Sequence, residues 1–101
     1  MHDTPSLTGR PAVDRQFESV GKVTDVIFAD TSSEPRWAVV KTGVLGGEHY
    51  VPLENTYVDE NGRLVVPFDK ATVKHAPKAR GDHVLTRDVA EELSEYYGAA
   101  A

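Results

Sequence analysis

Prolines and glycines divide the first two thirds of this 101-residue chain into segments that suit strands rather than long helices. Runs rich in β-branched residues at 20–28 and 36–41 lie between clusters of turn-forming residues, a pattern typical of strands with short connections. A further extended segment is expected at 48–53, and residues 57–58 are expected to pair with 63–66 across a tight turn. The spacing therefore predicts a mainly β domain, either a small antiparallel barrel or a sandwich.

The pattern changes to a helical one after Pro67. Asp69 is expected to cap a single helical turn over residues 70–74, and Thr86 to cap a last helix over 87–97 that ends at Gly98. Apolar side chains recur on this last helix at helical spacing, so one stripe is apolar and the other face is acidic. The stripe consists of Val89, Ala90, Leu93, Tyr96 and Tyr97.

These patterns predict three parts. Residues 1–10 are polar and show no apolar period, which indicates a disordered N-terminal tail. Residues 11–80 are expected to form the β domain, and residues 81–101 a helical C-terminal extension.

Composition excludes several classes of protein. With 11 Lys and Arg against 16 Asp and Glu, the net charge is −5, which disfavours a surface built to neutralise phosphates. No cysteine is present, so a disulfide framework, a thiol nucleophile and thiolate zinc sites are excluded. The apolar runs are too short to cross a bilayer and the start does not read as a secretory signal, so we expect a soluble, cytoplasmic protein.

The chemistry-bearing residues do not form a recognisable catalytic or metal site. His2, His49, His75 and His83 lack metal-ligand spacing, and we expect solvated histidines and no metal. No serine occupies a nucleophile elbow, and residues 43–47 lack the lysine and following helix of a phosphate loop. The chain is therefore expected to be no enzyme, with no catalytic residues and no cofactor.

Four motifs in a fixed order resemble the PRC-barrel family. They are VGKVTDV at 20–26, YVPL at 50–53, LVVPF at 64–68 and VKHAP at 73–77. The resemblance covers about residues 13–80, and residues 85–98 are similar to a short extension of small stand-alone bacterial members. Related barrels occur in the photosynthetic reaction-centre H subunit and in the ribosome maturation factor RimM.

The resemblance implies a small, strongly curved antiparallel β-barrel that serves as a docking module without a catalytic set. It implies that Gly21 opens the first long strand, that Pro52 ends a strand and that Pro77 closes the barrel segment. The expected function is a non-enzymatic adaptor that binds protein, docking on itself as a homodimer or on another cytoplasmic protein.

Large aromatic and apolar side chains are the candidates for that contact, because such groups contribute disproportionately to interfaces. The candidate interface residues are Trp37, Val89, Leu93, Tyr96 and Tyr97. Packing in the chain's own core is the alternative for each of them. The last helix would then cover its own barrel instead of reaching a second copy.

Two further functions are weighed against the adaptor. An RNA-associated role, by analogy with the ribosome factor, would use the basic residues Lys70, Lys74, Lys78 and Arg80, a stretch that also reads as a solvated charged loop. Nucleic-acid binding is therefore not expected. A small-ligand carrier or enzyme would need a closed pocket with converging polar groups.

Overall fold

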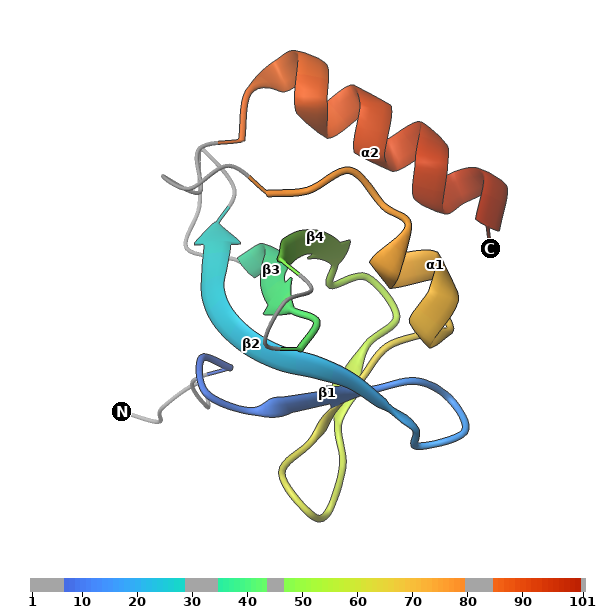
Figure 1. The fold of residues 1–101 in the computed structure, drawn as a ribbon. Helices are drawn as coiled ribbons and strands as arrows, with labels where there is room; N and C mark the ends of the chain where they lie inside the picture. Colours follow the sequence, from blue (N-terminus) through green and yellow to red (C-terminus); the bar gives the residue numbers. More distant parts are fainter. Residues whose placement is uncertain (1–6, 29–34, 44–46, 80–84, 101) are drawn as a thin grey trace.

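The computed structural model describes residues 7–28, 35–43, 47–79 and 85–100. All six strands in this part of the chain belong to one sheet with the order β4-β3-β2-β1-β6-β5. Two helices follow, and α2 crosses above β3 and β4 with α1 beneath its C-terminal half (Figure 1). The elements are β1 (Pro11–Val13), β2 (Ser19–Phe28), β3 (Pro35–Lys41), β4 (Glu48–Pro52), β5 (Tyr57–Val58), β6 (Leu64–Val65), α1 (Lys70–Lys74) and α2 (Arg87–Ala100).

Most of the elements predicted from the sequence are confirmed. β2, β3 and β4 lie within one residue of the segments expected at 20–28, 36–41 and 48–53. β5 and β6 pair in antiparallel register, as expected for residues 57–58 and 63–66. Asp69 caps α1 by accepting a hydrogen bond from the Thr72 N–H at 2.8 Å. The turn expected after β2 lies, apart from Pro35, outside the described residues.

Two local features of β2 bring the strands together and bend them. A Cβ on Gly21 would lie 2.1 Å from the Lys41 carbonyl oxygen, so only glycine allows β2 and β3 to approach this closely. Thr24 is an extra residue between the pairs Val23↔Val40 and Asp25↔Val39, which makes it a β-bulge. Bulges increase local twist and bending, in keeping with the strong curvature of β2 in Figure 1.

The prediction of a mainly β fold is confirmed, but that of an antiparallel barrel holds only in part. Four of the five strand pairings in the described residues are antiparallel, whereas closure of the sheet into a barrel is wrong. In the described residues β4 and β5 stand at opposite ends of the sheet order and do not pair, and β1 pairs with β6 in parallel. A strand that closed the barrel would have to pair with the free edge of β4. That edge already accepts a hydrogen bond, because the Ala79 N–H donates to the Glu48 carbonyl at 2.6 Å. β5 and β6 contain two residues each, so they are too short to continue the strand pairing around a closed barrel.

The core lies between the sheet and the two helices. Apolar residues of β2, β3 and β4, several of them valines, make the largest contribution to it, and Val73 of α1 and Leu93 and Tyr97 of α2 pack against them. The described part of the C-terminal segment is therefore part of the same packing unit as the sheet. α2 does not end at Gly98 as predicted but runs through it to Ala100.

The predicted N-terminal tail extends too far along the chain. Leu7 packs against the core, and the Gly9 N–H donates to the Val23 carbonyl at 2.8 Å. Arg10 in turn accepts from the Val23 N–H at 2.9 Å. Residues 7–10 are thus tied to β2 by backbone hydrogen bonds that the polar composition did not reveal, while residues 1–6 lie outside the described residues.

Candidate functional site

A groove of about 770 Å³ lies between α2 and the sheet. Its walls come from the start of β3, the end of β4 with the turn after it, the segment Pro67–Phe68, and the C-terminal half of α2. Arg15, from the turn between β1 and β2, completes the rim. Segments far apart in the sequence therefore meet here because α2 packs back across the sheet.

Three aromatic residues line the floor of the groove. Trp37 and Phe68 are each 8% exposed and Tyr97 is 3% exposed, so each ring is mostly packed into the core. The rings of Phe68 and Tyr97 are tilted, with centroids 4.6 Å apart. A floor of this kind offers apolar surface at fixed positions, which suits an apolar side chain of a ligand or partner.

The tyrosine pair anchors α2 to the rest of the molecule. The Tyr97 hydroxyl donates to the Tyr50 carbonyl of β4 at 2.6 Å, and the Tyr96 hydroxyl donates to the Thr72 carbonyl of α1 at 2.6 Å. Burial raises the pKa of Tyr97, and neighbouring Tyr96 raises it further. Tyr97 therefore stays a neutral hydrogen-bond donor and holds the groove wall in place.

The rim of the groove combines charge with backbone that cannot donate hydrogen bonds. Arg15, Arg36 and Glu54 line it, and all three side chains are exposed. Pro35 and Pro52, at the ends of β3 and β4, have no N–H to offer. Recognition at this rim would therefore depend on side chains rather than on adding a strand to the sheet.

The five predicted interface residues lie partly at this groove and partly beneath it. Trp37 and Tyr97 line the groove, whereas Leu93 is fully buried in the core. Val89 and Tyr96 are half-buried against that core. The stripe of α2 thus covers its own sheet, and a role of these residues in partner contact stays a prediction.

Sequence reasoning missed the polar and small residues of the groove. Arg15, Arg36 and Glu54 stand in turns or at strand ends without a motif around them. Ser94 and Gly98 line the helical wall and lie four residues apart on one face of α2. Pro35, which begins β3, and Pro52, which ends β4, were the available signal, because they mark the neighbouring ends of two paired strands.

A second hollow, of about 480 Å³, contains part of the basic stretch. Lys70 and Lys74 of α1 line it together with the carboxylate residues Asp14, Glu18 and Asp69. Three acidic residues offset two lysines, so this surface does not favour a polyanion. Lys78 is exposed elsewhere, and Arg80 lies outside the described residues.

The expectation of solvated histidines is wrong for His49. This side chain is 1% exposed, and its Nδ1 lies 2.9 Å from the Ala76 carbonyl oxygen, a bond that holds β4 to the segment after α1. His75 is exposed at the C-terminal end of α1, and His2 and His83 lie outside the described residues. Where the structure describes side chains, His, Asp and Glu form no cluster of three or more suited to a metal ion.

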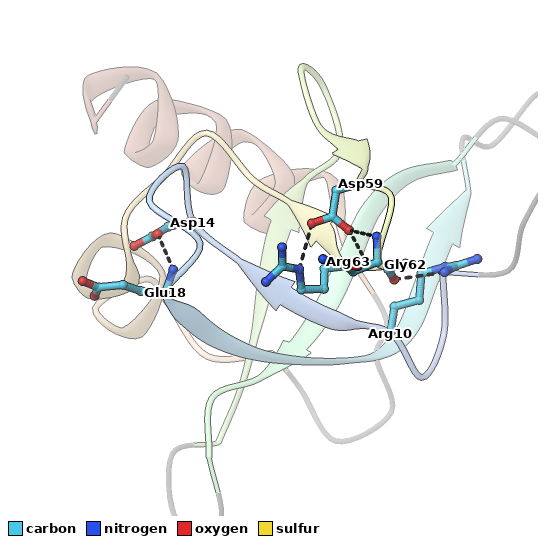
Figure 2. A network of polar contacts seen from close by, with 7 residues as sticks. Arg10, Asp14, Glu18, Asp59, Gly62 and Arg63 are labelled. Carbon is cyan, nitrogen blue, oxygen red and sulfur yellow. Dashed lines mark hydrogen bonds and ion pairs between the residues drawn. The ribbon is translucent and has the colours of Figure 1, made fainter.

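Polar residues of the turns form a network of hydrogen bonds and an ion pair at the end of the sheet opposite the groove (Figure 2). Arg63 pairs with Asp59 at 2.8 Å, and Arg10 donates to the Gly62 carbonyl at 3.0 Å. Burial raises the pKa of Asp59, but the hydrogen bonds from Arg63 and Asn61 and the charge of Arg63 outweigh it, so the pKa lies below its ordinary value. The Thr72 hydroxyl and N–H likewise lower the pKa of Asp69. Each of these two carboxylates is therefore hydrogen-bonded to residues that follow it within four positions in the sequence.

Exposed apolar side chains gather around the β5 end of the sheet. Tyr57 is 55% exposed and Val58 37% exposed, and within the described residues no strand pairs with the outer side of β5. Phe17 is 48% exposed in the turn between β1 and β2, with the Arg63 guanidinium 5.1 Å from its ring centroid. Phe17 has a φ of 63°, which is uncommon for a large side chain and was not predicted.

Comparison with known proteins agrees with the motifs in the sequence. The family model of the PRC-barrel domain matches residues 2–73, starting earlier and ending earlier than the resemblance at 13–80. The match therefore spans all six strands and most of α1, and leaves α2 outside. A search among curated proteins found no match. None of the helices in the described residues is long and apolar enough to span a membrane. By the extent of its match, the chain belongs to the PRC-barrel domain family.

Proposed function

We infer that this chain is a non-enzymatic protein-binding module, an adaptor that docks on a protein partner through the groove between α2 and the sheet. The groove is the observation that supports this function most directly. It combines a fixed aromatic floor with an exposed charged rim, and Trp37 and Tyr97, both interface candidates, line it. The cytoplasmic location expected from the composition, and the bacterial source that the family resemblance implies, belong to the same proposal.

The described titratable groups at the groove support binding rather than catalysis. Tyr97 has a raised pKa, but its hydroxyl already donates to the Tyr50 carbonyl. The carboxylates with lowered pKa values, Asp59 and Asp69, do not line the groove. A carboxyl or phenol group that acts as a general acid or base near neutral pH needs a pKa shifted toward that pH, and the shifts of Asp59, Asp69 and Tyr97 all lead away from it.

A photo-crosslinking amino acid placed at Ser94 tests this function in the cells from which the chain comes. Ser94 is exposed and lines the groove, whereas Glu92 is exposed on another side of α2 and serves as the matched control. We expect a reproducible protein adduct from position 94 and not from position 92. The captured protein, purified separately, should then bind the unmodified chain.

The same experiment distinguishes a second copy from a different protein. An adduct of twice the chain's mass would identify the partner as a second copy, and sedimentation equilibrium would then show a dimer. Equal crosslinking from positions 94 and 92, or none from either, would contradict docking at the groove.

A further inference from the structure

We propose that the groove selects a short acidic segment of its partner, with one apolar side chain seated on the aromatic floor and carboxylates facing Arg15 and Arg36. This inference rests on the proposed protein-binding function and names the chemistry of the partner. Its support comes from the charge of the rim, the composition of the floor and the size of the groove.

The charge of the rim has the opposite sign to that of the whole chain. The chain carries 16 acidic against 11 basic residues, whereas the charged residues that line the groove are Arg15, Arg36 and Glu54. Both arginines are exposed and available for two-point hydrogen bonding to carboxylates. The acidic remainder of the surface would attract basic segments elsewhere. At the groove itself, the local excess of positive charge favours acidic side chains of the partner.

The aromatic floor of the groove can accommodate one apolar side chain of the partner. Trp37, Phe68 and Tyr97 are almost fully buried, and the hydroxyl of Tyr97 is hydrogen-bonded to the Tyr50 carbonyl. Apart from the indole N–H of Trp37, the floor therefore presents mainly ring carbon. A branched or aromatic side chain seated on these ring carbons would gain free energy by losing its contact with water.

The size and the helical wall of the groove favour a short segment. A volume of about 770 Å³ lies in the range of pockets that enclose a small ligand, so a few side chains of the partner would fill it. Ser94 and Gly98 keep the helical wall low, and a Cβ on Gly98 would meet nothing within 4 Å. That open space accommodates the backbone of the incoming segment.

Selection from a displayed library of short random peptides on the intact protein tests the inference. We expect the enriched peptides to combine aspartate or glutamate with one large apolar residue. Trp37 is the only tryptophan of the chain, so its fluorescence reports binding of an enriched peptide directly. The acidic peptide should bind about tenfold more tightly than its lysine counterpart, since two exposed ion pairs are replaced by repulsion.

Two variants with matched controls show where the peptide binds. Gly98→Leu projects into open space and raises helix propensity, so the fold is retained while the groove is filled and peptide binding is lost. Gly98→Ala is the control and should bind normally. Arg36→Glu should reverse the preference toward the lysine peptide, whereas Arg87→Glu, at the far end of α2, should leave it unchanged.

The outcomes separate this inference from the function on which it rests. Enrichment of basic or uncharged peptides, no enrichment above the Gly98→Leu variant, or unchanged preference in Arg36→Glu would overturn the acidic partner. A protein adduct at position 94 would still stand in each of those cases. Conversely, acidic selection without any adduct in cells would refute the proposed function and leave the chemical preference of the groove established.

Discussion

β4 and β5 are the two edge strands of the same sheet, but the free edge of β4 is covered and that of β5 is open. The free side of β4 accepts a hydrogen bond from the Ala79 N–H, and Tyr97 of α2 donates to its Tyr50 carbonyl. β5 has no such cover among the described residues, and Tyr57 and Val58 remain exposed. The covered edge is buried in the core, whereas the open edge projects from it.

The difference shows two ways of protecting a sheet edge from unwanted pairing. β4 is protected by chain that follows it, and the covering helix also forms one wall of the candidate docking groove. β5 is protected by its brevity, and Asp59 and Glu60 follow it directly. Short strands and flanking charge are a common way to limit edge-to-edge association. Stability should therefore depend far more on the β4 side than on the β5 side.

Leu93→Ala should have the largest effect, because Leu93 is fully buried and joins α2 to the sheet. We expect the free energy of unfolding in urea to fall by about 2–5 kcal/mol, the range for such a cavity. Ser94→Ala, at the next position and exposed, is the control and should change it by less than about 0.5 kcal/mol. Equal effects would mean that α2 is not part of the core.

Tyr97→Phe should come next, since it keeps the ring and removes one hydroxyl. The Tyr50 carbonyl would lose its 2.6 Å donor in a buried place, at a cost of about 1–3 kcal/mol. Urea unfolding measures the loss, and hydrogen exchange should rise along β4. A neutral result would show that another donor replaces the hydroxyl.

Asp59→Asn should have a smaller, pH-dependent effect at the open end. The folded-state pKa of Asp59 lies below its ordinary value of 3.8, so its contribution is complete above that value and is lost as the pH falls through the folded-state pKa. Thermal unfolding should therefore show a less stable variant near neutral pH, and the two proteins should converge in acid. A difference that persists at the lowest pH would exclude the charge as its cause.

Tyr57→Thr should have the smallest effect. Tyr57 is 55% exposed, so the free energy of unfolding should change by less than about 0.5 kcal/mol. The variant should also keep its crosslinks at position 94. A marked loss of stability or of partner binding would mean that the open edge is covered in solution.

The sequence was informative where local chemistry decides the structure. β-branched runs located β2 and β3, and Asp69 located the start of α1. Each of these depends on a residue and its near neighbours. The apolar stripe of α2 was also visible, because helical spacing can be read directly from the sequence.

Features set by distant parts of the chain could not be predicted in this way. The parallel pairing of β1 with β6 joins residues about fifty positions apart, and the burial of His49 depends on the Ala76 carbonyl. The groove is even harder to predict from the sequence, because Arg15, Glu54 and Gly98 line the same hollow only after α2 packs on the sheet. The left-handed backbone of Phe17 depends on Asp14, whose Oδ1 accepts from the N–H groups of Gln16 and Glu18.

Amide NMR of the labelled protein, titrated with the tightest acidic peptide from the library, tests most directly that docking occurs at the covered side of the sheet. The account predicts shifts of the Trp37 indole and of the amides of Glu54, Asn55, Ser94 and Gly98, which surround the groove. The amides of Tyr57 and Val58 should stay in place. Shifts confined to β5, with the Trp37 indole unchanged, would contradict the account.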